Sequence, residues 1–230
     1  MDTITLYYFN VGDRGILKSN IPVKFLLTYI MIPTVTNARG ENVKLLLEDA
    51  GLNHNYIRLP RGEVWAAKKA QLIDEGFLSP TLPFIEVGDK KYGKAIPIMQ
   101  YISAKLGNKY HGSDAEEDHY LAYVAEVTTE WYECLRTSFF GTDQDKEHHI
   151  KNITPHYINL FEKFYAKHNG PYVLGDNITY PDFLIYHLLD DDLALCRLAG
   201  SPNLQKFAET FENRPNIKKY FATLPNLSSK

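Results

Sequence analysis

Runs of apolar residues predict four short strands in the first half of the chain. The β-branched and aromatic segment from Ile4 to Phe9 favours extended backbone, and the segments Tyr56 to Leu59 and Phe84 to Val87 have the same character. The polar segment Gly88 to Tyr92 has the composition of a hairpin turn that leads into a fourth strand. Between the strands, apolar residues recur at helical spacing in the ranges 41–50, 65–73 and 97–106, and each run stops near a glycine.

The second half of the chain has a different pattern. After Gly112 no strand pattern occurs, and four stretches have the period of helices, namely 116–136, 144–168, 179–198 and 203–213. The change falls near residues 108–113, where glycine and polar residues cluster as they do in linkers. We therefore predict an α/β domain over residues 1–107 followed by an all-α domain over residues 114–230.

One helix start is marked by several residues at once. Thr179 is a natural N-cap, and Asp182 stands where its carboxylate reaches back to the Thr179 amide and complements the positive end of the helix. We expect a structural role for Thr179 and Asp182.

A proline stands at the head of the third predicted strand. Pro83 has no backbone N–H, so it belongs at the first residue of that strand, and the bond that precedes it is a candidate for the cis form. A cis bond would turn the amide and carbonyl of Leu82 outward, where an extended peptide can pair with them. The alternative is an ordinary edge strand that begins with proline.

Composition excludes several classes of function. The net charge is −3 and no cluster of Lys and Arg occurs, which argues against nucleic acid as the partner. Cys134 and Cys196 lie far apart, so a disulfide framework and a cysteine-based zinc site are excluded, and a reducing compartment is favoured. The uncharged stretch 25–38 is too short to span a bilayer, so we expect no membrane anchor.

Two polar clusters suggest metal binding at first sight. Three consecutive carboxylates at residues 190–192 cannot share one helix face, and the adjacent pair His148 and His149 lacks the spacing of helical ligands. We expect both clusters to lie at the solvent surface, and we expect no metal site.

Five segments, taken in order, resemble a cytosolic glutathione S-transferase of the tyrosine type, with a sigma-like pattern. The resemblance covers nearly the whole chain. Its segments are Leu6 to Asn10 at the first strand, Arg39 to Asn42 at the first helix, Trp65 with Lys69, Thr81 to Pro83 as a cis-proline loop, and Gly175 to Asp182 as a helix-capping motif.

The resemblance implies a fold and a reaction. It implies a thioredoxin-like domain along which glutathione lies, and a helical domain that binds a small hydrophobic electrophile. Tyr8 would donate a hydrogen bond to the glutathione sulfur and favour the thiolate, which is the reactive form. Glutathione is then a co-substrate, and no other cofactor is needed.

The resemblance also implies binding residues and an assembly. Trp65 and Lys69 would contact the glycine carboxylate of glutathione, and Arg39, Leu82 and Pro83 belong to the same binding set. A cytoplasmic homodimer is implied as well, with Glu126 or Glu130 offering a carboxylate to the glutathione amino group across the dimer.

Two features depart from the family pattern. The family carries Gln or Glu followed by Ser before its third helix, whereas Lys94 and Ala95 stand here, so the hydroxyl that binds the γ-glutamyl carboxylate is missing. Backbone amides at the helix start and the charge of Lys94 can still hold that carboxylate, more weakly. The second departure is residues 12–38, which we interpret as an insertion of recent or artefactual origin, such as a translated unspliced segment.

The departures leave alternatives to a transferase. A non-catalytic protein that keeps the fold for ligand or partner binding is one, and a glutathione-dependent isomerase is another. Four aromatic residues of the helical half either line the electrophile pocket or fill the core, and the core is the expected place: Tyr120, Tyr123, Trp131 and Phe139.

Overall fold

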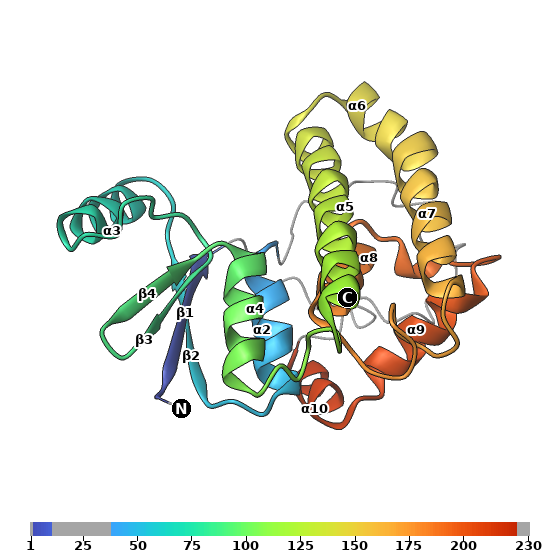
Figure 1. Ribbon diagram of the computed structural model, residues 1–230. Helices are drawn as coiled ribbons and strands as arrows, with labels where there is room; N and C mark the ends of the chain where they lie inside the picture. Colours follow the sequence, from blue (N-terminus) through green and yellow to red (C-terminus); the bar gives the residue numbers. More distant parts are fainter. Residues whose placement is uncertain (1, 11–37, 225–230) are drawn as a thin grey trace.

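The computed structural model describes residues 2–10 and 38–224. These residues form a mixed sheet with three helices, followed by a helical part that lies against one side of them (Figure 1). The predicted fold class, α/β plus all-α, is confirmed. The proposed insertion lies outside the described residues except for Ala38, so its structure does not enter the account.

The sheet has four strands, and its order follows from the connections between them. The strands are β1 (Ile4–Phe9), β2 (His54–Leu59), β3 (Phe84–Val87) and β4 (Lys90–Gly93), in the order β2-β1-β3-β4. β1 and β2 run parallel, because a helix connects them, whereas β3 is antiparallel to both of its neighbours. The predicted bounds of β1 and β3 are correct, and β2 begins two residues earlier than predicted.

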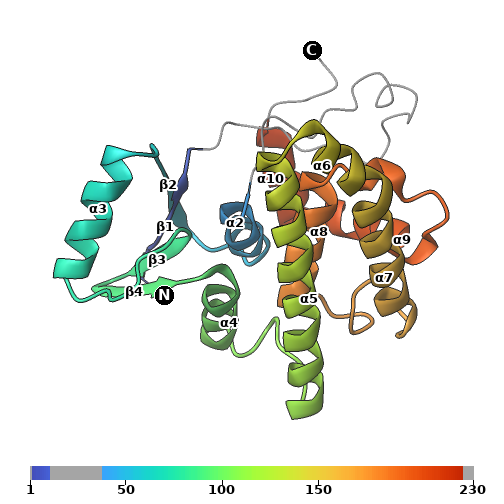
Figure 2. The same cartoon turned by 90° about the horizontal axis from the view of Figure 1, so that it is seen from above.

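Three helices cover the sheet. Helices α2 (Gly40–Asp49) and α4 (Ala95–Lys105) lie on the face that is turned toward the helical part, and α3 (Glu63–Asp74) lies on the opposite side (Figure 2). Side chains of β1 alternate between these two faces.

The helical part begins with the long helix α5 (Ala115–Phe140). It continues through α6 (Asp143–His148), a π-helical turn (His149–Ile153), α7 (Thr154–Ala166), α8 (Tyr180–Asp191), a short 3-10 turn (Leu195–Arg197), α9 (Pro202–Glu212) and α10 (Pro215–Thr223). The predicted helix over 179–198 is wrong beyond Asp191, and α10 was not predicted. Pro215 occupies the first turn of α10, a position where proline is tolerated.

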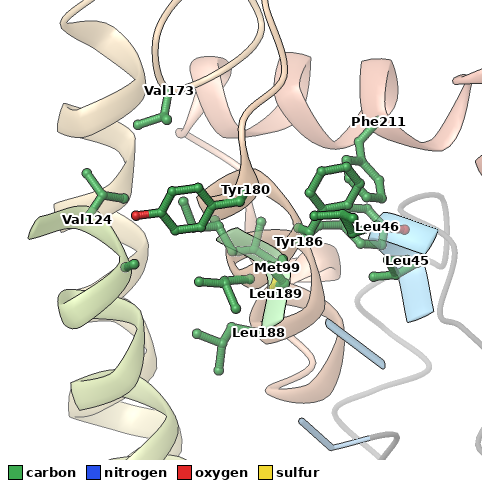
Figure 3. Close-up of a cluster of buried hydrophobic side chains, with 14 of the residues drawn as sticks. Leu45, Leu46, Met99, Val124, Val173, Tyr180, Tyr186, Leu188, Leu189 and Phe211 are labelled. Carbon is green, nitrogen blue, oxygen red and sulfur yellow. The ribbon is translucent and has the colours of Figure 1, made fainter. Parts of the chain in front are cut away.

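The two parts share one hydrophobic core. Figure 3 shows Leu45 and Leu46 of α2 and Met99 of α4 beside Tyr186 and Leu189 of α8. Every residue of α8 is buried, so this helix is the centre of the packing between the sheet part and α5.

The segment that connects the parts is anchored to both. Tyr110 is fully buried, and its hydroxyl donates to Oδ2 of Asp49 at 2.8 Å. The same carboxylate receives Nε of Arg214 at 2.5 Å and Nη2 of Arg214 at 2.8 Å. An ion pair thus links α2 to the residue that precedes α10.

The prediction that residues 190–192 are solvated is wrong. All three carboxylates are buried. Asp192 accepts from the indole Nε1 of Trp131 and the hydroxyl of Thr154, both at 2.8 Å, and lies 2.9 Å from Nε2 of His149. Of the predicted surface pair, His148 is exposed as expected, whereas His149 in the π-helical turn is buried. These donors explain why the carboxylate of Asp192 is tolerated in the core.

The predicted helix start at Thr179 is confirmed. Oδ2 of Asp182 accepts from the amide and the hydroxyl of Thr179, each at 2.7 Å. Oδ1 accepts from the Tyr165 hydroxyl at 2.8 Å and from the Val173 amide at 3.1 Å. Asp182 therefore ties the loop before α8 to α7 as well as capping the helix.

Candidate active site

A cleft of about 330 Å³ lies between the sheet part and the helical part. One wall comes from α2, the loop before β3 and the start of α4, and the other wall comes from α5 and α8. The residues that line the cleft are Arg39, Asn42, Thr81, Leu82, Pro83, Lys94, Ala95, Ile96, Pro97, Thr128, Thr129, Tyr132, Leu184, His187 and Leu188. Five of the binding residues predicted from the sequence are thus brought together: Arg39, Leu82, Pro83, Lys94 and Ala95.

The loop before β3 offers backbone groups to the cleft. The Leu82–Pro83 peptide bond is cis. Among the described residues, no backbone group pairs with the amide or the carbonyl of Leu82, because the ladder between β1 and β3 stops at Phe84. An extended peptide can therefore pair with Leu82 as an added strand would.

Two side chains in the cleft present polar atoms that have no hydrogen-bond partner among the described residues. They are Oδ1 of Asn42, a residue that is 6% exposed, and Oγ1 of Thr81. A buried polar atom without a partner costs about 1–3 kcal/mol, so such atoms indicate a place for a polar ligand. Sequence reasoning missed Asn42, because a single amide at the start of a helix carries no pattern.

Cationic groups flank the same cleft. Lys94 precedes α4 with a positive φ of 70°, which directs the chain into the helix, and Ala95 is the first helical residue. The free amides at this helix start favour an anion. Across the cleft, the guanidinium of Arg39 lies 4.1 Å from the centre of the Tyr132 ring and 3.2 Å from Oε1 of Glu133. The cleft therefore suits a polar molecule with carboxylates.

Tyr8 faces the helical part, and it is not among the residues that line the cleft. It shares the inner face of β1 with Ile4 and Leu6, and its ring passes so close to α2 that a Cβ at Gly40 would lie 2.5 Å from its Cγ. Only glycine fits there. The Tyr8 hydroxyl lies close to the Tyr132 hydroxyl and to the backbone amide of Arg39, and both neighbours influence its pKa.

Burial raises the pKa of Tyr8 well above its usual range, and the neighbouring Tyr132 hydroxyl raises the pKa further. The hydroxyl therefore stays protonated at neutral pH and acts as a donor.

Tyr7 has a different environment from its neighbour. Its ring stacks on Phe84 with centroids 4.4 Å apart, and its hydroxyl donates to Oε2 of Glu86 at 2.7 Å. Because the side chains of a strand alternate, Tyr7 lies on the face of the sheet that α3 covers. Of the two tyrosines, only Tyr8 faces α5.

A second cavity, of about 210 Å³, adjoins Tyr8. The cleft and this cavity share the side chain of Tyr132. The described residues that line the cavity are Tyr8, Phe9, Ala38, Arg61, Tyr132, Leu135, Arg136, Phe139, Phe140 and Asp191. Tyr132 was not singled out from the sequence, since its importance comes from its place between the two spaces.

Trp65 and Lys69 lie outside the residues that line the cleft. The Trp65 ring meets the edge of Phe9 with centroids 5.8 Å apart, and Lys69 is exposed on α3. Both residues are on the far side of β1 from α2.

The four aromatic residues of the helical part have different places. Trp131 is fully buried and stacks on Tyr157, and Tyr120 is partly buried beside Phe164, as expected for core residues. Tyr123 is 53% exposed, so the expectation of a core position is wrong there. Phe139 lines the second cavity instead of the core.

His187 is a further buried residue in the cleft. Its Nε2 lies 3.4 Å from Oδ2 of Asp191, a residue that lines the second cavity. Within residues 2–10 and 38–224, no cluster of His, Cys, Asp and Glu has the arrangement of a metal site. No helix in the same ranges is long and apolar enough to cross a membrane.

Comparisons with known proteins agree with this arrangement of parts. Residues 129–223 match the family model described as "Glutathione S-transferase, C-terminal domain". The chain is similar to "Glutathione S-transferase P" of Caenorhabditis elegans, with 31% identity over 199 residues that cover 84% of this chain and 90% of that protein. It is 28% identical over 212 residues to "Glutathione S-transferase 1" of Ascaris suum, covering 88% and 97% of the two chains.

A solved structure has the same fold. The Pi-class glutathione S-transferase of Onchocerca volvulus superposes with a TM-score of 0.75 at 22% sequence identity, over 99% of each chain.

Proposed function

Because the chain belongs to the glutathione S-transferase family, we propose that its activity takes place where the cleft meets the second cavity. The protein is a glutathione transferase that conjugates the thiolate of glutathione to small hydrophobic electrophiles, and glutathione is a co-substrate that needs no further cofactor. The observation that carries the proposed location is that Tyr132 lines both spaces, with the hydroxyl of Tyr8 close to it in the second cavity.

Glutathione has groups that match the cleft. Its cysteinyl main chain would pair with the free amide and carbonyl of Leu82. Its γ-glutamyl carboxylate would lie at the start of α4, beside Lys94 and the amide of Ala95. Its remaining N–H groups would satisfy Oδ1 of Asn42 and Oγ1 of Thr81, which have no partner among the described residues.

The glycine end of glutathione has two candidate contacts. Arg39 lines the cleft and offers a guanidinium to the carboxylate. Trp65 and Lys69 stay predictions from the family resemblance, since they lie beside β1 and not along the cleft.

The Tyr8 hydroxyl would donate a hydrogen bond to the glutathione sulfur. A thiol with a pKa near about 8.5 is mostly protonated at neutral pH, and a donor aimed at the sulfur stabilises the thiolate. The thiol proton passes to solvent, the sulfur forms a bond to the electrophilic carbon, and the leaving group departs with its electron pair. Tyr8 keeps its own proton throughout, in agreement with its raised pKa.

Several finer statements belong to the same proposal. We assign residues 1–107 to glutathione and residues 114–230 to the electrophile. We also propose the tyrosine type, a homodimer and a cytoplasmic location. The sigma-like pattern stays a prediction beside relatives whose names denote the pi class.

Conjugation of glutathione to chlorodinitrobenzene tests the activity. We expect turnover above the uncatalysed rate, with kcat/KM lowered by about 100-fold in Tyr8→Phe, as for loss of one donor to a developing anion. A well-folded protein without turnover would support a ligand-binding role instead.

A further inference from the structure

The second cavity joins aromatic walls to two guanidinium groups. Phe9, Phe139 and Phe140 supply apolar surface, and Arg61 and Arg136 line the same space. An electrophile bound there would contact both kinds of group while the glutathione sulfur beside Tyr8 attacks it.

Arg61 is the less engaged of the two cations. Its guanidinium lies 5.1 Å from the centre of the Phe9 ring, and among residues 2–10 and 38–224 no carboxylate forms an ion pair with it. A guanidinium that lies over an aromatic face keeps its outward N–H donors free for a planar anion.

Arg136 already shares a carboxylate. Its Nε lies 2.7 Å from Oε2 of Glu133, whose other oxygen lies 3.2 Å from Nη2 of Arg39. The carboxylate of Glu133 thus accepts from two guanidinium groups. Arg136 would add to the positive potential of the cavity but would contribute less than Arg61 to holding a new anion.

The acidic side chain in the described lining of the cavity already contacts other groups of the protein. Asp191 is buried, accepts the Ala38 amide at 3.1 Å, and lies 3.4 Å from Nε2 of His187. The described lining of the cavity thus includes one carboxylate and two guanidinium groups. The cations therefore dominate the cavity.

We propose that the preferred electrophiles carry a carboxylate that binds Arg61. This inference rests on the proposed function and adds a substrate class to it. The apolar body of the molecule packs against Phe9, Phe139 and Phe140, and the electrophilic carbon faces Tyr8. A neutral hydrophobic electrophile fills the same space but leaves the guanidinium without an anion.

A matched pair of acceptors tests the proposal. A chloronitrobenzoate and its uncharged amide have the same ring and leaving group, and each enzymatic kcat/KM is divided by the uncatalysed rate constant of that acceptor with glutathione. In the unmodified protein we expect the carboxylate to be favoured. In Arg61→Gln the ratio of carboxylate to amide falls by about tenfold, as expected for one charge-assisted hydrogen bond. Arg136→Gln lowers the same ratio by a smaller factor.

The control is Lys219→Gln, which removes a positive charge from the exposed face of α10. We expect this variant to have the same ratio of carboxylate to amide as the unmodified protein. A general effect of net charge would instead lower the ratio as much as Arg61→Gln does. A second readout does not need turnover. Calorimetry with unreactive nitrobenzoate and nitrobenzamide, in the presence of S-methylglutathione, gives the same preference and the same loss.

The outcomes separate the two proposals. Turnover of both acceptors with an equal ratio in the unmodified protein and in Arg61→Gln would overturn the carboxylate preference and leave the transferase intact. Absence of turnover with both acceptors would contradict the proposed site of conjugation. Equal binding of nitrobenzoate and nitrobenzamide in that case would overturn the preference as well.

Discussion

Tyr8 on β1 and Tyr132 on α5 line the same cavity, with their hydroxyl groups close to each other. The two residues come from the two parts of the molecule, and Tyr132 lines both the cleft and the second cavity. The Tyr8 side chain is buried and packed against Gly40, so its position is fixed before the substrate binds. Such preorganisation lowers the cost of placing a donor at a developing anion.

Restoring the missing hydroxyl should improve glutathione binding. Ala95→Ser places a donor at the first residue of α4, where the γ-glutamyl carboxylate is proposed to lie. We expect KM for glutathione to fall about fivefold, which corresponds to roughly 1 kcal/mol for one hydrogen bond. Steady-state kinetics at a fixed concentration of electrophile measure the change. Ala104→Ser, on an exposed position of the same helix, is the matched control, and an equal effect of both substitutions would contradict the assignment.

The ion pair between α2 and the residue before α10 should contribute to stability. Arg214→Ala leaves the buried Asp49 carboxylate with the Tyr110 hydroxyl but without its cation. We expect the free energy of unfolding to fall by about 3–5 kcal/mol, as for other buried pairs that lose one partner. Urea unfolding measures it.

The control for that prediction is Lys151→Ala, which removes one partner of the exposed pair between Lys151 and Glu147. Its effect should stay below about 1 kcal/mol, because solvent screens the pair. A loss in Arg214→Ala no larger than the loss in this control would show that the pair is dispensable.

A buried carboxyl should make stability depend on pH. Burial raises the pKa of Glu41 to about 7, against a weaker opposing effect of the bond from the Tyr220 hydroxyl at 2.6 Å. Between the ordinary pKa of about 4.3 and 7, the folded state holds a proton that the unfolded state releases, so stability falls as the pH rises through this interval.

Glu41→Gln tests the sign of that effect. Glutamine does not ionise, and its amide oxygen can still accept from Tyr220. We expect the free energy of unfolding to decline less steeply with rising pH in the variant than in the unmodified protein. Between acidic pH and pH 8, the difference between the two proteins should shift in favour of the variant by up to about 3 kcal/mol. Urea titrations at several pH values give the difference. Parallel curves for the two proteins would contradict the raised pKa.

Local signals in the sequence predicted much of the fold. The periods of apolar residues gave the strands and most helices, and Pro83 and Thr179 marked two element starts, because each acts through its immediate neighbours. Contacts between distant residues had no such signal. Trp131, which donates to Asp192, is 61 positions away in the sequence. The three consecutive carboxylates therefore predicted a solvated segment, although all three are buried.

Contacts between distant residues also decided which parts of the candidate site could be predicted. The resemblance to a known family pointed to Tyr8, Arg39 and the segment around Pro83. Tyr132 and Asn42 were missed, because their roles depend on how α5 and α2 face the cleft and not on their neighbours in the sequence. Arg61 and Arg136 meet in one cavity for the same reason.

The acidity of bound glutathione tests the central claim most directly. Ultraviolet absorbance of the thiolate, followed against pH, gives the thiol pKa in the complexes of the unmodified protein, Tyr8→Phe and Tyr132→Phe. The account predicts a pKa below the usual value of about 8.5 in the unmodified protein, a similar value in Tyr132→Phe, and a return to about 8.5 in Tyr8→Phe. A thiol pKa that stays equally low in Tyr8→Phe would contradict it.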